Sequence, residues 1–182
     1  MHCSKAGTGQ LISFAHLRRM PTSTAPAKGN IITKPAADEL RITRVYNAPR
    51  KLVFKAWTTP TMLEQWFGCS AFTTTFAEAD VRVGGEWRVG MRSPEGDVYI
   101  AFGVYKALRP VEHLALTHQW SRMTANVNPP NHETLVTVDL YEEGTGTRME
   151  FRQTGLATEA SRDSHQGGWG DSFDALAKVL EE

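Results

Sequence analysis

The sequence is poor in cysteine and carries no excess charge of either sign. Its 182 residues include two cysteines, Cys3 and Cys69, and its 20 basic residues are balanced by 20 acidic ones. Two cysteines at no recognisable spacing exclude a disulfide-rich scaffold, so we expect a reducing, cytoplasmic environment. Because a neutral chain creates no global field that attracts polyanions, we expect no nucleic-acid partner. No apolar run approaches the roughly 20 residues of a bilayer-spanning helix, so we expect no membrane partner either.

Motifs for phosphate or metal binding are also missing. The pair Gly84-Gly85 lacks the Lys-Ser/Thr continuation of a phosphate loop, and residues 144–147 join two predicted strands, so a bend and a turn explain these glycines better. His113 and His118 stand five apart on a predicted strand, which points their side chains to opposite faces. We therefore expect no cofactor and no metal ion.

Residues 1–37 differ from the rest of the chain in charge. They contain five basic residues and no acidic one. The apolar stretch 11–17 is too short for a secretory signal and precedes its arginines, while an organellar transit peptide fits only if the source is eukaryotic. We predict a flexible basic leader over residues 1–37 that contributes little to stability, followed by one folded domain over residues 38–182.

Hydrophobic periodicity predicts the order of elements in that domain. Alternating polar and apolar residues over 39–46 predict a first strand with one buried face. Helical spacing predicts a short helix over 49–58 and a second one over 61–67, which ends at Gly68. From residue 71 to residue 153 the period changes to two, which predicts about six consecutive antiparallel strands.

The last segment returns to helical spacing with a single apolar stripe. The stripe consists of Trp169, Phe173, Leu176 and Leu180. One helix with one apolar face must cover one sheet. The sequence therefore predicts an α+β fold in which a curved antiparallel sheet of about six to seven strands wraps around a long C-terminal helix, with two short helices after the first strand.

Three short motifs, taken with this order of elements, resemble one family. They are Trp66-Phe67-Gly68, Gly84-Gly85-Glu86-Trp87 and Gly168-Trp169. Over roughly residues 40–180 their order and spacing resemble the bacterial relatives of the activator of the heat-shock-protein-90 ATPase, in the START-like (SRPBCC) superfamily of helix-grip folds. The resemblance implies a hydrophobic cavity between sheet and helix. It leaves the function open, because carriers, cyclases, hydrolases and chaperone partners share this architecture.

The candidate binding residues are large side chains predicted to face inward. They are Trp57, Trp66, Phe67, Trp87, Met91, His118, Trp120, Met149, Phe151, Trp169 and Phe173. Periodicity predicts that these side chains face inward, whereas the cavity is implied by the resemblance alone. For each residue the alternative is that it packs in the hydrophobic core and contacts no ligand. His118 is the titratable residue on this face, and it is either a buried structural histidine or a group that orients a ligand.

We expect a non-catalytic protein that binds a small hydrophobic or amphipathic molecule, because the inward aromatic set includes no paired acid and base. The first alternative is a cyclase- or hydrolase-like enzyme in which His118 acts as acid or base, with Asp80 or Glu78 assisting. A nucleophilic Cys69 is a weaker candidate, since a lone cysteine is more often a packing residue.

The second alternative is a module that binds a chaperone or a second copy of itself. It follows from the family name, which would also connect the protein with the stress response. Eukaryotic activators carry a separate N-terminal domain for which 182 residues leave no room, so we do not take the name as an activity.

Overall fold

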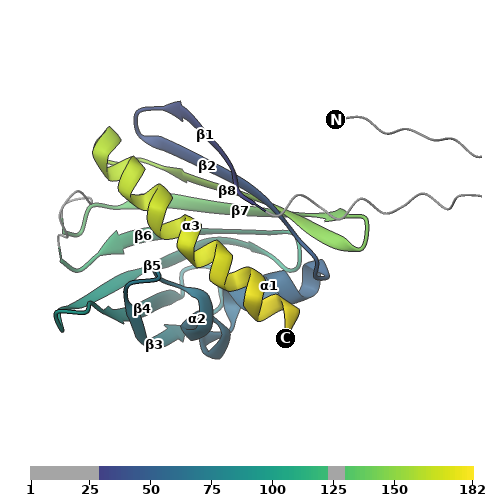
Figure 1. Cartoon of the computed structure of the whole chain (residues 1–182), viewed down its shortest axis with the longest axis horizontal. Helices are drawn as coiled ribbons and strands as arrows, with labels where there is room; N and C mark the ends of the chain where they lie inside the picture. Colours follow the sequence, from purple (N-terminus) through teal and green to yellow (C-terminus); the bar gives the residue numbers. More distant parts are fainter. Residues whose placement is uncertain (1–28, 123–129) are drawn as a thin grey trace, which may run out of the picture.

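The structure is a computed structural model and describes residues 29–122 and 130–182. These residues form one eight-stranded antiparallel sheet and three helices (Figure 1). The strands are β1 (Ile31–Ala36), β2 (Glu39–Tyr46), β3 (Thr73–Ala79), β4 (Glu86–Arg92), β5 (Val98–Arg109), β6 (His113–Trp120), β7 (Thr134–Glu143) and β8 (Gly146–Thr154). The helices are α1 (Arg50–Thr58), α2 (Pro60–Trp66) and α3 (Glu159–Glu181).

The sheet is open, and one of its faces is covered by the long C-terminal helix. Its strand order is β1-β2-β8-β7-β6-β5-β4-β3, so β1 and β3 form the edges. Figure 1 shows α3 crossing the sheet diagonally, with α1 and α2 near its C-terminal end. This arrangement confirms the predicted α+β fold, with a curved antiparallel sheet that wraps the terminal helix. None of the described helices combines the length and apolar character that a membrane span requires.

The two short helices begin and end within about a residue of the predicted positions. The Pro49 carbonyl accepts the first hydrogen bonds of α1, and Pro60 occupies the first turn of α2, where a missing N–H costs nothing. Gly68 follows α2 with a φ of 128°. Because side chains disfavour that conformation, glycine suits the sharp exit toward β3.

The predicted alternation of buried and exposed residues is also observed. On β4, Trp87, Val89 and Met91 are buried, whereas Arg88 and Arg92 are exposed. The apolar stripe of α3 is buried against this inner face, and it consists of Trp169, Phe173, Leu176 and Leu180. The core thus lies between α3 and one face of the sheet.

Strand β1 lies in the segment that we assigned to the leader, and it brings the sheet to eight strands where six to seven were expected. Ile31 pairs with Thr43 and Ile32 with Ile42 of β2, so the sheet begins before the boundary predicted at residue 38. All six residues of β1 are exposed. Without a buried face the strand has no hydrophobic pattern, which is why periodicity missed it. The rest of the predicted leader, residues 1–28 with Cys3, lies outside the described residues.

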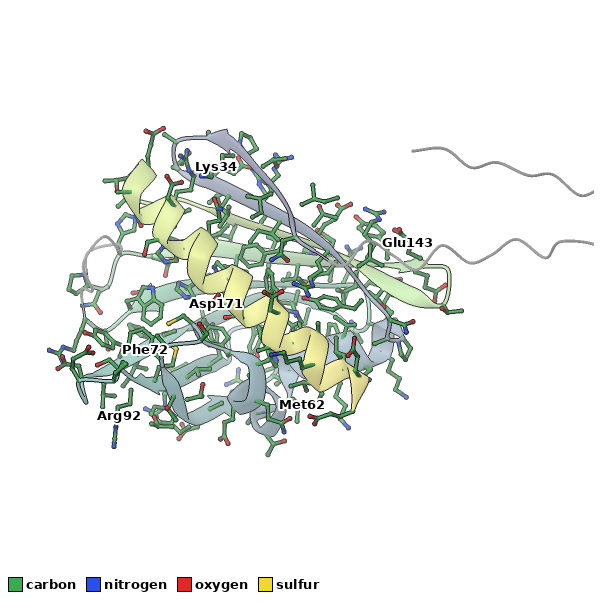
Figure 2. All side chains as sticks on the ribbon, in the orientation of Figure 1. Lys34, Met62, Phe72, Arg92, Glu143 and Asp171 are labelled. Atoms are coloured by element: carbon green, nitrogen blue, oxygen red, sulfur yellow. The ribbon has the colours of Figure 1, made fainter. Side chains whose placement is uncertain are left out.

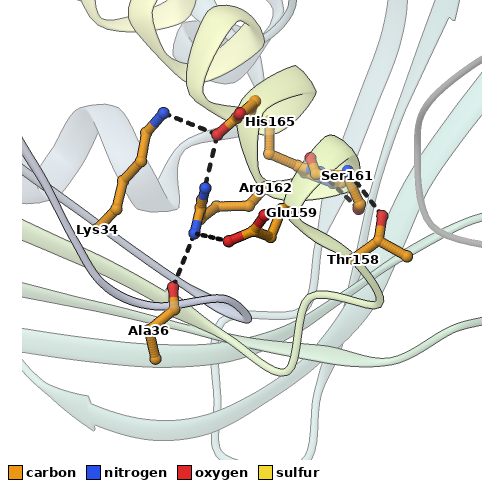
Figure 3. Close-up of polar contacts among 8 residues, drawn as sticks. Lys34, Ala36, Thr158, Glu159, Ser161, Arg162 and His165 are labelled. Carbon is orange, nitrogen blue, oxygen red and sulfur yellow. Dashed lines mark hydrogen bonds and ion pairs between the residues drawn. The ribbon is translucent and has the colours of Figure 1, made fainter.

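Polar contacts tie β1 to the start of α3 (Figure 3). The Lys34 ammonium lies 2.7 Å from an Asp163 carboxylate oxygen. The Arg162 guanidinium donates a 3.0 Å hydrogen bond to the Ala36 carbonyl and, like Lys34, contacts Asp163. Because β1 has no buried apolar face, these polar contacts attach the edge strand to α3.

The bend predicted at Gly84-Gly85 is confirmed. Gly84 has a φ of 81°, and a Cβ atom built on Gly85 would collide with the Asp80 carbonyl oxygen. The Gly84 N–H also donates to the Tyr105 carbonyl at 2.8 Å, which links the turn before β4 to β5. Glycine is therefore required here by a neighbouring backbone as well as by conformation.

A chain that begins at residue 38 should be less stable than one that begins at residue 29. The shorter chain loses the β1 ladder and leaves the largely buried Arg162 without its Ala36 acceptor, at a cost of roughly 2 kcal/mol. For a domain of this size we expect a melting temperature about 4–8 °C lower. Lys34→Ala in the longer chain is the control and should change stability little, since exposed ion pairs contribute about 0–1 kcal/mol. Equal melting temperatures for the two chains would contradict the role given to β1.

Candidate functional site

A cavity of about 160 Å³ lies between the sheet and the middle of α3. The residues around it come from the segment after α2, from β4, from the start of β5, from β6 and from α3. They are Phe67, Gly68, Cys69, Phe72, Met91, Tyr99, His118, Trp120, Ser164, His165, Gly168, Trp169 and Ser172. Figure 2 labels Phe72 and Asp171, which mark the side of the molecule where the segment after α2 meets α3.

The lining changes from buried and apolar at one end to partly exposed at the other. Phe67, Met91 and Trp169 are buried, whereas Phe72 and Tyr99 are half-buried and in contact, with ring centroids 5.6 Å apart. The cavity therefore opens to solvent on its less buried side, where the lining residues are half-buried or exposed; they include Cys69, Phe72, Tyr99, Trp120, Ser164 and Gly168. None of the described residues that line it is a lysine, arginine, aspartate or glutamate.

His118 is the most deeply buried polar side chain of the lining, with 1 % of its surface exposed. Its ring is surrounded by four other rings at centroid distances of 5.4–5.9 Å, those of Trp87, Trp120, His165 and Trp169. Within the described part of the chain its Nδ1 has no hydrogen-bond partner. Burial, helped by the neighbouring His165, lowers the pKa of His118 to about 3. The imidazole is therefore neutral at physiological pH.

His165 is a second buried histidine beside His118, and it corrects our expectation that His118 has no titratable neighbour. Its Nδ1 donates to the Ser161 carbonyl at 2.8 Å, and its Nε2 accepts a 3.2 Å hydrogen bond from the Trp120 indole. This network assigns the proton to Nδ1. Burial lowers the pKa of His165 as well. A second proton, on His165 Nε2, would also be unfavourable because that nitrogen accepts the hydrogen bond from the Trp120 indole N–H. Both histidines are thus held neutral.

A buried chain of hydrogen bonds fixes the helix above the cavity to the sheet below it. The Trp169 indole donates to the Gln153 amide oxygen at 2.8 Å, and the Gln153 amide nitrogen donates to the Thr134 hydroxyl at 2.9 Å. The Thr134 hydroxyl in turn donates to the His118 carbonyl at 2.9 Å. The chain connects α3 to β8, β7 and β6, and it ends on the backbone of the histidine that lines the cavity.

The segment after α2 is clamped to α3 by two further side chains. The Ser172 hydroxyl accepts a 3.0 Å hydrogen bond from the Gly68 N–H and donates to the Gly168 carbonyl at 2.9 Å. The Asp171 carboxylate accepts from both the backbone N–H and the hydroxyl of Ser70. These contacts hold the segment that forms one wall of the cavity.

The structure places part of the predicted inward set at the cavity and the rest in the core beside it. The residues that line the cavity are Phe67, Met91, His118, Trp120 and Trp169. The others are buried in the hydrophobic core, and they are Trp57, Trp66, Trp87, Met149, Phe151 and Phe173. The ring centroids of Trp57 and Trp66 lie 4.8 Å apart, and those of Phe151 and Phe173 lie 5.2 Å apart. These rings therefore pack against one another in the core.

Several lining residues were missed by the sequence reasoning. They are Gly68, Phe72, Tyr99, Ser164, His165, Gly168 and Ser172. Phe72 lies outside regular structure, where no period assigns a facing. His165 had a usable signal, because it precedes Trp169 by four residues and Phe173 by eight and so belongs to the same helical stripe.

Of the further candidate catalytic groups, the structure brings Cys69 to the cavity but not Glu78 or Asp80. Cys69 lines the cavity, but burial raises the pKa of its thiol, so the nucleophilic thiolate is disfavoured. Glu78 and Asp80, expected to assist His118, lie elsewhere: they pair with Arg88 at 2.7 Å and Arg82 at 2.8 Å. Within residues 29–122 and 130–182 no group of three or more metal-binding side chains is gathered.

Comparisons with known proteins agree with this architecture. A family model described as Activator of Hsp90 ATPase homolog 1-like protein matches residues 47–181. Comparison with curated proteins found no match.

Solved structures of bacterial proteins have the same fold. Protein CV1439 from Chromobacterium violaceum is 24% identical, with 80% of this chain and 99% of that chain covered and a TM-score of 0.70. Protein NE0264 from Nitrosomonas europaea is 25% identical, with 81% and 97% covered and a TM-score of 0.68. The AHSA1 (SPO3351) protein from Silicibacter pomeroyi is 22% identical, with 79% and 97% covered and a TM-score of 0.67.

Replacing Gln153 should reveal the strength of its bond to Trp169. Gln153→Leu leaves the buried Trp169 indole N–H without its acceptor and removes the donor that bonds to the Thr134 hydroxyl, so we expect the free energy of unfolding to fall by about 2–4 kcal/mol in urea titrations. Trp169→Ala, which also removes the ring, should cost about 3–5 kcal/mol. A double-mutant cycle with Trp169→Phe, which keeps a ring but removes the indole N–H, measures the coupling. The stability lost in the double variant Gln153→Leu, Trp169→Phe should be smaller than the sum of the losses in Gln153→Leu and Trp169→Phe alone, since the double variant leaves no unpaired indole N–H. Strict additivity would contradict the coupling.

Acid should destabilise the fold through His118. The unfolded chain binds a proton near pH 6.5, whereas the folded chain does so only near pH 3, so stability is complete above 6.5 and decreases as pH falls between these values. One such histidine changes the free energy of unfolding by up to about 1.4 kcal/mol per pH unit, which amounts to roughly 2 kcal/mol between pH 7.5 and 5. In His118→Gln the slope of stability against pH should be shallower by one proton. Identical slopes in urea titrations of the two proteins would count against the buried neutral state.

Proposed function

The chain belongs to the Activator of Hsp90 ATPase homolog 1-like family, and from that premise we propose that it binds a small apolar or amphipathic molecule between the sheet and α3 without transforming it. Folds of this START-like kind commonly bind hydrophobic ligands. The observation that carries the proposal is the cavity itself: its buried end is formed by Phe67, Met91 and Trp169, and none of its described lining residues is charged. Sites for small molecules are characteristically concave and mostly apolar, with few polar groups.

Gly168 of α3 supports a role for the cavity in binding. Gly168 lines the cavity, and a Cβ atom built on it would have no heavy atom within 4 Å. Glycine inside a helix costs up to about 1 kcal/mol relative to alanine. The helix therefore retains a destabilising residue at a point where a side chain would project into the cavity.

The titratable groups support binding over catalysis. His118 and His165 are both held neutral by burial, and burial also favours the protonated thiol of Cys69. General acid–base catalysis needs a group whose pKa lies near the working pH and a partner that receives or supplies the proton. The described lining offers apolar contacts and hydrogen bonds, which are sufficient to bind and orient a molecule.

A matched pair of variants tests the location of binding. Apolar compounds that bind should raise the melting temperature, by about 5–10 °C when their concentration is 100 times Kd, and should change the fluorescence of Trp120 and Trp169. Gly168→Leu fills the cavity and should abolish both effects. Gly167→Leu gains the same helix propensity at an exposed position outside the lining, so it should bind as the unchanged protein does.

Three outcomes would overturn the proposal. Binding that survives Gly168→Leu would place the ligand elsewhere. Turnover of a bound compound that is lost in His118→Ala with the fold intact would favour an enzyme. If no apolar compound binds, a protein partner, either a chaperone or a second copy of the chain, becomes the better hypothesis.

A further inference from the structure

We propose that the ligand of this cavity is an uncharged molecule of about one aromatic ring with a hydroxyl group that hydrogen-bonds to His118 Nδ1. The inference rests on the proposed binding function and specifies the chemistry of what is bound. Its grounds are the size of the cavity, the absence of charge in its described lining and the buried nitrogen of a lining residue, His118 Nδ1, that has no partner.

The size of the cavity fits a single ring. Its volume is about 160 Å³, and an engineered apolar cavity of about 150 Å³ in another protein binds benzene. Ring faces and edges from three parts of the chain border the space, namely those of Phe67, Trp120 and Trp169. Aromatic walls favour a flat aromatic guest in offset or edge-to-face contact. A larger substituent would have to extend through the opening on the less buried side of the cavity.

The charge of the lining excludes an ionised group at the buried end. A carboxylate, phosphate or ammonium brought there would lose its hydration without meeting a counter-charge, which is strongly unfavourable. The two histidines do not change this, because burial keeps both neutral and the Nδ1 proton of His165 is already donated to Ser161. The ligand is therefore uncharged.

The hydrogen bonds already formed within the lining determine which polar groups remain for the ligand to bind. Most of the buried donors and acceptors there are already paired: Trp169 with Gln153, Trp120 with His165, and Ser172 with the backbone of Gly68 and Gly168. Among the described lining residues, His118 has a buried polar atom with no partner, its Nδ1.

A buried nitrogen without a partner is costly, and a ligand that bonds to it removes that cost. A hydroxyl group both donates and accepts, so it satisfies Nδ1 whichever tautomer His118 adopts. A methyl group of similar size leaves the nitrogen unpaired. The preference for a hydroxyl over a methyl group is therefore the measurable consequence of the orphan Nδ1.

Phenol, toluene and benzoate are the probes, and their affinities are measured at pH 7.5 by calorimetry or by tryptophan fluorescence. Phenol and toluene have nearly the same shape and differ in the hydroxyl group, whereas benzoate adds a charge. We expect phenol to bind on the order of tenfold more tightly than toluene, consistent with one buried hydrogen bond. Benzoate should bind at least tenfold more weakly than toluene.

Two variants assign the preference to His118. His118→Phe keeps a ring but removes the nitrogens, and the ratio of phenol to toluene affinity should fall to about one. His113→Gln changes the other histidine of β6, which pairs with Asp139 outside the cavity, and should keep the tenfold ratio. If His118→Phe does not fold, the nitrogen NMR signals of the unchanged protein give the answer: phenol, but not toluene, should shift the Nδ1 resonance of His118.

The outcomes separate this inference from the function on which it rests. Equal binding of phenol and toluene, or a preference for phenol that persists in His118→Phe, overturns the hydrogen bond and leaves the apolar binding function standing. Benzoate binding as tight as that of phenol overturns the requirement for an uncharged ligand. If none of the three probes and none of the larger apolar compounds binds, the proposed function itself fails.

Discussion

The hydrogen bond from the Trp169 indole to the Gln153 amide fixes where α3 lies on the sheet, and the arrangement of the cavity depends on it. A helix held by apolar contacts alone can slide along an aromatic surface with little change in buried area. A buried N–H that must find one acceptor removes that freedom, because an unpaired donor costs about 1–3 kcal/mol. Gln153 meets the donor at 2.8 Å and is itself held by Thr134, so the register of α3 is specified by polar groups inside an apolar core.

The cavity follows from this register. With Trp169 fixed, Gly168 faces the space beside it, and Ser172 and Asp171 reach the segment after α2 that forms the opposite wall. His165, one turn earlier on α3, meets Trp120 of β6 and closes another side. Protein interiors are otherwise packed as densely as organic crystals. A persistent cavity therefore requires walls that are held apart, and these hydrogen bonds supply that rigidity.

The sequence predicted the parts of the fold in which one face is buried. Strand β4 alternates buried and exposed residues and α3 has a regular apolar stripe, so each was recognisable by its period. Strand β1 has two exposed faces and therefore no period, and only its pairing with β2 makes it a strand. The residues of the site that lie on inward faces of regular elements could be predicted from the same periods. Trp120 and Trp169 are two of them, and both line the cavity. Phe72 and Tyr99 could not be assigned, because their positions depend on how the segment after α2 meets the sheet.

The free edge of β1 has a consequence for the behaviour of the folded protein in concentrated solution. An edge strand presents backbone groups that could pair with another chain and extend the sheet. On β1 that edge carries Lys34 followed by Pro35, a charged side chain next to a residue without an N–H. Because Pro35 has no N–H, it cannot donate a backbone hydrogen bond to an incoming strand. The proline thus works against intermolecular sheet growth along a strand that also exposes Ile31 and Ile32.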